Sequence, residues 1–231
     1  MIEKINVNDL TYETFLHDFA DKKPVIIQGA MDDWECNTWD LNYLASSLGD
    51  RKVTIRKSGI NNVRDFKQIQ LKNYIEHIDN NNDLWYCDWN YPIFGAEDLR
   101  SVYKTLDYFS FNTVMKDAAR EFRWFFLGSE NTGTPLHQDF NHTHAWNGVI
   151  FGEKKWVFFS EDDTKHLNNG NMDCFSNEIP TSATPYFISQ YAGEIIYAPR
   201  NWWHQVVNVK HTFSVSENFW FESELKEPVS K

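Results

Sequence analysis

From residue 122 to residue 220, short aromatic and β-branched runs alternate with polar turns, and this pattern limits the possible folds more than any other feature. The runs cover residues 122–128, 144–152, 154–160, 194–199, 203–209 and 212–220. Short strands at such regular spacing are typical of a β-sandwich or a β-barrel. We therefore predict that residues 122–220 form the β core of the molecule.

The first 121 residues combine helical and strand patterns. Apolar residues recur at helical spacing in residues 8–21, 38–50, 67–80 and 96–109, and strand-like runs cover residues 23–30, 52–58 and 84–89. We predict a single domain over residues 1–231, in which helices and strands of residues 1–121 pack on the β core. The polar stretch 161–183 is expected to be a long surface loop over one end of that core.

Composition and charge exclude several classes of protein. Lys and Arg total 22 against 33 Asp and Glu, and the net charge of −11 gives no attraction to a phosphate backbone, so nucleic acid is not an expected partner. Three cysteines without a CxxC motif argue against a disulfide scaffold and fit a reducing compartment. The N-terminus has no apolar signal region, and no stretch approaches the roughly 18 apolar residues of a membrane span. We expect a soluble cytoplasmic protein with no membrane partner.

The segment TGTPLHQDFNHTHAW, residues 132–146, contains a candidate pair of metal ligands. His137 and Asp139 are two positions apart, so on a strand their side chains point to the same face. His204, which opens a later strand behind two tryptophans, is the best third ligand. Two histidines and one carboxylate form the facial triad typical of non-haem Fe(II), which leaves coordination positions open. The same donors also suit zinc and manganese.

A second candidate feature is Lys154, which lies inside the apolar run FGEKKWVFF. A lysine within a β core needs an anionic partner, because an unpaired ammonium group is costly to bury. The protein itself or a dicarboxylate co-substrate could supply this anion. Alternation places Lys155 on the opposite face, and the sequence alone leaves open which of the two lysines points inward.

Three segments together resemble the Jumonji C (JmjC) domain, the Fe(II)- and 2-oxoglutarate-dependent oxygenase branch of the cupin superfamily. They are RWFFLGSENTGTPLHQD, AWNGVIFGEKKWVFF and GEIIYAPRNWWHQVVN. The last is similar to the second cupin motif, G-x5-P-x-G-x2-H-x3-N, with Gly193, Pro199, His204 and Asn208 in place and Asn201 at the motif's glycine. The N-terminal KPVIIQGAMDDW resembles the opening of small JmjC hydroxylases. The resemblance implies a mainly β fold, a double-stranded β-helix (jelly roll) core with N-terminal helices and strands packed on it.

The resemblance also implies roles for individual residues. His137, Asp139 and His204 would bind Fe(II), and Lys154 would pair with the distal carboxylate of 2-oxoglutarate. The other expected co-substrate contacts are Thr134, Asn147, Ser216, Asn218 and Trp85. Trp85 stands where many relatives carry a tyrosine, and Tyr86 follows it on the opposite face, so the sequence leaves open which of them makes that contact.

By the same resemblance, the chain would be a dioxygenase that hydroxylates a protein side chain and releases succinate and CO2. The spacing is similar to that of lysyl-hydroxylase-like members, so lysine is the first expected target, ahead of asparagine, arginine and histidine. The alternatives are an N-methyl-lysine demethylase of the same chemistry and a cupin metalloenzyme that does not use 2-oxoglutarate. A third is a binding module without catalysis. The resemblance leaves a homodimer open.

Overall fold

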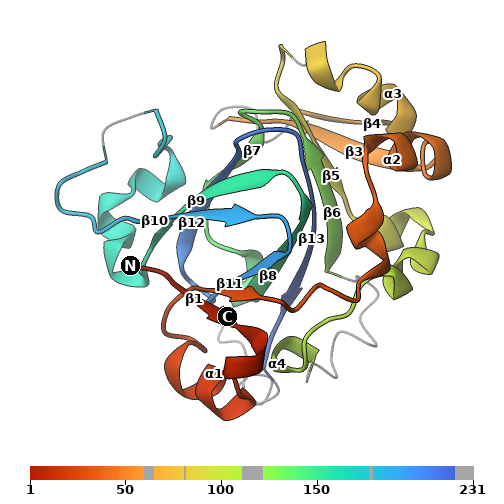
Figure 1. Cartoon of the computed structure of the whole chain (residues 1–231). Helices are drawn as coiled ribbons and strands as arrows, with labels where there is room; N and C mark the ends of the chain where they lie inside the picture. The colour runs from red at the N-terminus through yellow and green to blue at the C-terminus, as the bar shows by residue number, and fades with distance from the viewer. Residues whose placement is uncertain (60–64, 81, 111–121, 177–178, 222–231) are drawn as a thin grey trace.

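The computed structural model describes residues 1–59, 65–80, 82–110, 122–176 and 179–221, and in it two facing β-sheets form the centre of the molecule (Figure 1). Successive strands of the β core alternate between the sheets, except that β9 and β10 form a hairpin within the smaller sheet. The larger sheet holds β6 (Arg123–Gly128), β8 (His144–Phe151), β11 (Glu194–Ala198) and β13 (Thr212–Phe219); the smaller sheet holds β7 (Gly133–His137), β9 (Glu153–Phe159), β10 (Tyr186–Tyr191) and β12 (Trp203–Asn208). This alternation is the arrangement of a double-stranded β-helix and confirms the predicted fold class.

Strands from the N-terminal part extend the larger sheet at both edges. Its order is β1-β2-β11-β8-β13-β6-β5-β3-β4, with β1 (Glu3–Asn6), β2 (Val25–Gln28), β3 (Lys52–Lys57), β4 (Phe66–Gln70) and β5 (Trp85–Trp89). β2 pairs with β11 and β5 pairs with β6, so the N-terminal part shares backbone hydrogen bonds with the β core. Residues far apart in sequence are thereby fixed in one sheet.

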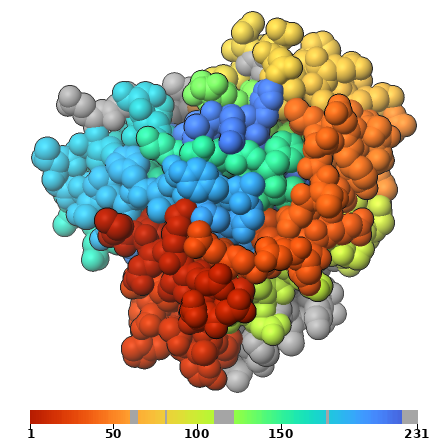
Figure 2. Space-filling view, viewed as in Figure 1, coloured from red at the N-terminus to blue at the C-terminus, as the bar shows by residue number. Residues whose placement is uncertain are grey.

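Short helices cover the outer face of the larger sheet, and the space-filling view shows this part of the chain, red to yellow, wrapped around the core (Figure 2). The α-helices are α1 (Tyr12–Asp18), α2 (Leu41–Ser47), α3 (Leu71–Ile75) and α4 (Asp107–Ser110). The 3₁₀ helices of this part are η1 (Val7–Asp9), η2 (Glu35–Thr38), η3 (Ile78–Asn80), η4 (Tyr91–Phe94) and η5 (Glu97–Val102). Three more, η7 (Phe140–His142), η8 (Glu161–His166) and η9 (Asn168–Gly170), lie between strands of the β core. Within the described ranges, no helix is long and apolar enough to cross a bilayer.

Side-chain caps explain where two of these helices begin. The hydroxyl of Thr11 accepts a hydrogen bond from the Thr14 amide at 3.1 Å, and α1 starts at the next residue. A carboxylate oxygen of Asp40 accepts one from the Tyr43 amide at 2.7 Å before α2. Each side-chain oxygen thus accepts a hydrogen bond from a backbone N–H group in the first turn of its helix, where that group has no partner within the helix. This interaction is the usual reason for Thr and Asp at an N-cap.

The helix expected over residues 67–80 was wrong in its first half. Residues Phe66–Gln70 form β4, which pairs with β3 and places Ile69 opposite Val53. The helical pattern is satisfied only in α3 and the short η3 that follows. Pairing along the sheet edge therefore outweighs the local helical preference here.

The polar stretch 161–183 lies elsewhere than expected. Its described residues include η8 and η9, and they cover the outer face of the smaller sheet instead of one end of the core. Leu167, Met172 and Cys174 are buried there against Phe159 and Trp203. Residues 177–178 of this stretch lie outside the described ranges.

Candidate active site

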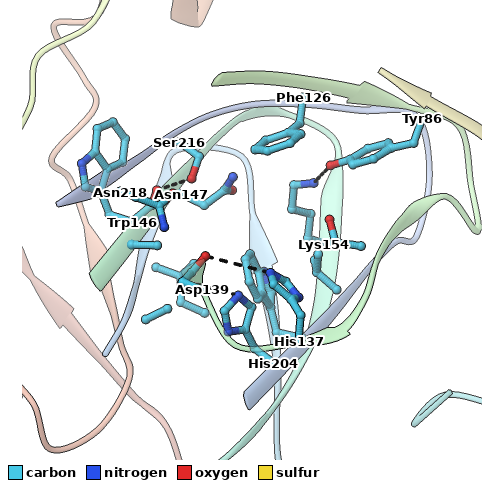
Figure 3. A pocket seen from close by; sticks show the side chains of 16 residues that line it. Tyr86, Phe126, His137, Asp139, Trp146, Asn147, Lys154, His204, Ser216 and Asn218 are labelled. Carbon is cyan, nitrogen blue, oxygen red and sulfur yellow. Dashed lines mark hydrogen bonds and ion pairs between the residues drawn. The ribbon is translucent and has the colours of Figure 1, made fainter. Parts of the chain in front are cut away.

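The three predicted metal ligands converge between the two sheets (Figure 3). β7 ends at His137, and His204 near the start of β12 is its direct partner in the antiparallel register. Asp139 follows just beyond β7 in extended backbone. One ligand atom from each of the three lies within 4.8 Å of the others. The structure thus brings together the donors of a facial triad.

Both imidazoles are held with one nitrogen free for a metal. The Nδ1 atom of His137 lies 2.8 Å from the Pro135 carbonyl oxygen, and that of His204 lies 3.1 Å from the Trp202 carbonyl oxygen. A carbonyl oxygen only accepts, so each Nδ1 carries the proton and each Nε2 keeps its lone pair. Metal-binding histidines are usually oriented by such a second hydrogen bond.

The electrostatics of the triad also fit a divalent cation. Burial, together with the neighbouring His137, lowers the pKa of His204 to about 4, so its ring is neutral at physiological pH. One carboxylate oxygen of Asp139, Oδ2, is buried without a hydrogen-bond partner in the described part of the chain, and it lies 3.7 Å from Nε2 of His204. A buried carboxylate oxygen without a donor is costly, and a bound cation removes that cost.

Lys154 on β9 points into the same pocket, while Lys155 faces outward over the Phe175 and Phe187 rings. The Lys154 side chain is 1% exposed, and its ammonium group donates to the Tyr86 hydroxyl at 3.1 Å and to Oδ1 of Asn208 at 3.0 Å. Burial lowers its pKa to about 7. Across the described ranges no carboxylate pairs with it, so the pocket has a place for an anion.

The structure corrects the assignment of Trp85. Its indole lies outside this pocket, with the ammonium groups of Lys57 and Lys67 over the ring at 5.5 and 4.3 Å. Tyr86, the neighbour on the opposite face of β5, lines the pocket and stacks on Phe126 at 5.6 Å. The phenol of Tyr86 is therefore the group that reaches Lys154. The position that matches the tyrosine of many relatives is Tyr86, one residue after the predicted Trp85.

The other expected pocket residues lie where they were predicted. Thr134, Asn147, Ser216 and Asn218 all line the pocket. Figure 3 labels the last three. Ser216 donates to the Trp146 carbonyl oxygen at 2.6 Å, and Asn218 donates to Thr143 at 3.0 Å, so both side chains have internal partners. Nδ2 of Asn147 donates to Ser214 at 3.2 Å, whereas its Oδ1 has no hydrogen-bond partner in the described chain. Their contacts with a co-substrate stay predictions.

Sequence reasoning missed the role of Asn208. This residue was recognised as part of the second motif, yet its amide both accepts from Lys154 and donates to Thr132 at 3.1 Å. Asn208 lies four positions after His204 on β12, so strand alternation already placed both on the pocket face. That spacing was the signal that could have identified it.

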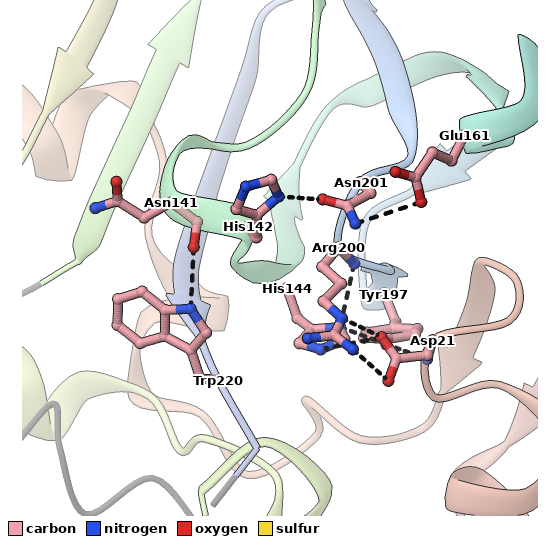
Figure 4. A network of polar contacts seen from close by, with 9 residues as sticks. All are labelled: Asp21, Asn141, His142, His144, Glu161, Tyr197, Arg200, Asn201 and Trp220. Carbon is pink, nitrogen blue, oxygen red and sulfur yellow. Dashed lines mark hydrogen bonds and ion pairs between the residues drawn. The ribbon is translucent and has the colours of Figure 1, made fainter. Parts of the chain in front are cut away.

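The motif's one departure, Asn201, has a structural explanation (Figure 4). Its φ of 62° is the left-handed conformation that favours glycine and, next, asparagine. Its carbonyl oxygen accepts a hydrogen bond at 2.6 Å from the side chain of Gln138, the residue between His137 and Asp139. Its Oδ1 lies 2.5 Å from Nδ1 of His142. Asn201 therefore keeps the turn that glycine would allow and links the two segments that carry the metal ligands.

Comparison with known proteins agrees with this geometry. A family model described as a cupin-like domain matches residues 13–227. The chain belongs to this family. It is 26% identical over 244 residues to the arginine-specific demethylase JMJ22 of Arabidopsis thaliana, covering 95% of this chain and 46% of the relative. It is 25% identical over 252 residues to the bifunctional arginine demethylase and lysyl-hydroxylase psr-1 of Caenorhabditis elegans, with 94% and 61% covered.

A third relative is named for its cofactors. The 2-oxoglutarate and iron-dependent oxygenase JMJD4 of Gallus gallus is 26% identical over 256 residues, covering 92% of this chain and 59% of the relative. These names confirm the resemblance to JmjC oxygenases. The cupin-like chain spans about half to three fifths of the length of the three relatives, at 46%, 61% and 59%.

Proposed function

We propose that this cupin-like protein is an Fe(II)- and 2-oxoglutarate-dependent oxygenase that hydroxylates a protein side chain. The observation that carries the proposal is the pairing of two features in one pocket. The triad of His137, Asp139 and His204 provides three metal donors, and buried Lys154 in the same pocket has no carboxylate partner in the described chain. A metal site alone would not require that lysine.

Different residues of the pocket would hold the metal and the co-substrate. His137, Asp139 and His204 would hold the iron, and Lys154 with Tyr86 would hold the distal carboxylate of 2-oxoglutarate. When bound, the iron supplies the oxidative chemistry, in which dioxygen converts 2-oxoglutarate to succinate and CO2 and one oxygen atom enters a substrate C–H bond. Apolar side chains of Phe126, Trp156 and other lining residues exclude water from this reaction.

The first expected target is a lysyl side chain of a protein. Support comes from the relatives, since psr-1 is named as a lysyl-hydroxylase and an arginine demethylase, and JMJ22 is named as an arginine-specific demethylase. Demethylation begins with the same hydroxylation, at an N-methyl group, and is the alternative. Mass spectrometry separates them, because hydroxylation adds one oxygen atom, about 16 Da, whereas demethylation removes a methyl group and releases formaldehyde. Oxidation of a metabolite, with no change in any protein, would contradict both.

The decisive experiment is spectroscopic and needs no substrate. Under nitrogen, Fe(II) and then 2-oxoglutarate are added, and the weak visible charge-transfer band of a chelated iron–2-oxo-acid complex is recorded. We expect a band that disappears in Asp139→Ala and requires more 2-oxoglutarate in Lys154→Met. A folded, metal-bound protein without a band would favour a cupin enzyme that does not use a 2-oxo acid. Failure to retain any metal would favour a binding module.

We also place the protein in the cytoplasm. Cys36, Cys87 and Cys174 are buried and free, and burial raises the pKa of the Cys36 thiol to about 12 and that of Cys174 to about 11. Thiols of this kind are compatible with a reducing compartment. Subcellular fractionation followed by immunoblotting tests this location.

A further inference from the structure

Five aromatic side chains lie on and next to β6, in the turn after Asp139 and just after β13, and we call them the aromatic wall. Its members are Phe122, Trp124, Phe126, Phe140 and Trp220. Phe126 lines the pocket, and Trp124 lies two positions away on β6, so strand alternation places both on the inner face of the sheet. The Asn218 amide donates to the Phe122 carbonyl oxygen at 3.0 Å, which continues the ladder between β6 and β13 by one step.

The outer end of the wall lies beside a metal ligand. Phe140 directly follows Asp139, and its ring centroid is 4.7 Å from that of Phe122 and 6.2 Å from that of Trp124. Trp220 meets Phe122 edge-on at 5.9 Å. Four of the five rings therefore form one contacting group next to the metal ligand Asp139.

The wall is held in place and remains partly open to solvent. The indole Nε1 of Trp220 donates to the Asn141 carbonyl oxygen at 3.1 Å, and Asn141 and His142 are both left-handed, with φ of 52° and 53°. These contacts fix the turn that carries Phe140. That ring is nevertheless 42% exposed, and Phe122, Trp124 and Trp220 are half-buried. Rings with this exposure are not part of a closed core and can contact a ligand.

The charges around the wall favour a cationic ligand. Among the described residues that line the pocket, Lys154 is the single Lys or Arg, and it is buried beside Tyr86 and Asn208. Arg123, next to Trp124 on β6, lies on the opposite strand face and pairs with Glu217 at 3.3 Å. The whole chain carries a net charge of −11. Aromatic faces attract ammonium and guanidinium groups, and methylene stems pack well on such rings.

We propose that the aromatic wall binds the cationic side chain of the target residue, lysyl or arginyl, and so selects substrates for the neighbouring iron site. The methylenes of that side chain lie against the rings of Trp124 and Phe140, and its charged head contacts an aromatic face. This inference deepens the proposed function and rests on it, because the wall matters as a substrate site only if the pocket performs the oxidation.

The test measures binding directly, without turnover. The full chain is loaded with Mn(II) and 2-oxoglutarate under nitrogen. Four fluorescein-labelled peptides, identical except for a central lysine, arginine, norleucine or glutamate, are titrated by fluorescence polarisation. Norleucine has the lysine stem without its charge. We expect the lysyl or arginyl peptide to bind about tenfold more tightly than the norleucyl peptide, and the glutamyl peptide to bind most weakly.

Variants assign this preference to the wall. Trp124→Leu and Phe140→Leu should each reduce the preference for a cation about two- to fivefold, while Phe140→Tyr should retain it. Phe187→Leu is the matched control, since Phe187 is 45% exposed, also contacts a second ring and lies on β10, outside the pocket lining. The control should bind like the parent.

Three outcomes would overturn the proposal. They are equal or tighter binding of the norleucyl or glutamyl peptide, an unchanged preference in both leucine variants, and no binding of any peptide. The visible band of the iron complex, recorded on the same samples, distinguishes the two failures. A retained band without a preference for cationic peptides would contradict only the proposed role of the wall. A missing band would contradict the proposed oxygenase activity.

Discussion

At the scale of single residues, Lys154 should make co-substrate affinity depend on pH. Burial lowers its pKa from 10.5 to about 7, so the free protein loses this charge above that pH. An anion in the pocket favours the ammonium form, and binding above pH 7 therefore requires proton uptake. We expect the affinity of the Mn(II)-loaded protein for 2-oxoglutarate to fall as the pH rises above 7, by at most about tenfold per unit.

Anaerobic calorimetry between about pH 6.5 and 9, in buffers of different ionisation enthalpy, measures both the affinity and the proton uptake. Lys154→Met keeps most of the side-chain volume and has no titrating group. It should bind 2-oxoglutarate more weakly than the parent at pH 7, with a flatter pH profile. Parallel profiles for parent and variant would show that another group carries the proton.

Asn201 permits a second prediction at this scale, based on its φ of 62°. Asn201→Gly removes the side-chain links to His142 and Glu161 but keeps the favoured backbone conformation. Asn201→Ala removes the same links and adds left-handed strain. We expect the alanine variant to be less stable than the glycine variant by about 1 kcal/mol, measured by denaturant unfolding. Equal stabilities would mean that backbone strain has no role at this turn.

At the scale of elements, the pairing of β7 with β12 assembles the metal site. Gly133 begins β7, and a Cβ atom there would lie 2.1 Å from the carbonyl oxygen of Val206 on β12. The carbonyl oxygen belongs to the backbone and the Cβ atom is bonded directly to it, so neither can move aside without separating the strands that carry His137 and His204. We expect Gly133→Ala to cost about 1–3 kcal/mol of stability and to weaken Mn(II) binding.

A glycine in the other sheet provides the control for this change. In Gly148→Ala on β8, the new methyl group would meet the Trp34 ring at 3.0 Å, and a side chain can shift by a few tenths of an ångström. Gly148→Ala should therefore lose less stability than Gly133→Ala, and it should bind Mn(II) as tightly as the parent protein. Denaturant unfolding and a metal titration on both variants test this contrast. Similar losses of metal affinity would argue against a special role for the β7–β12 pair.

The elements also show which parts of the fold could be predicted from sequence. Strands rich in aromatic and β-branched residues were identified correctly, since their local pattern and their buried position agree. β1, β4 and β10 were missed, and each is an edge strand that pairs on one side only; β7 was not among the predicted runs either. In β10 the aromatic Phe187 and Tyr191 are exposed while polar Gln190 is buried, so hydrophobicity along this strand does not follow burial. In the site, spacing predicted the convergence of His137, Asp139 and His204. The inward direction of Tyr86 depends on the register between β5 and β6, which spacing cannot reveal.

At the scale of the whole molecule, metal and co-substrate should stabilise the fold in two separable steps. A ligand that binds only the folded state at about 100 times its Kd adds about 2.7 kcal/mol, which for a chain of this size raises Tm by roughly 5–10 °C. We expect Mn(II) to raise Tm and 2-oxoglutarate to raise it further under nitrogen. Asp139→Ala should lose both increments, whereas Lys154→Met should lose mainly the second.

The metal-free Tm of Asp139→Ala adds information that binding cannot give. Without a cation, Asp139 keeps a buried oxygen that lacks a donor in the described chain, so the native residue destabilises the empty fold. We therefore expect the metal-free variant to melt at the same temperature as the parent or at a higher one, by differential scanning calorimetry in chelator. A clearly lower Tm would mean that the carboxylate supports the fold itself. A higher Tm combined with lost metal binding would show that stability has been exchanged for a functional site.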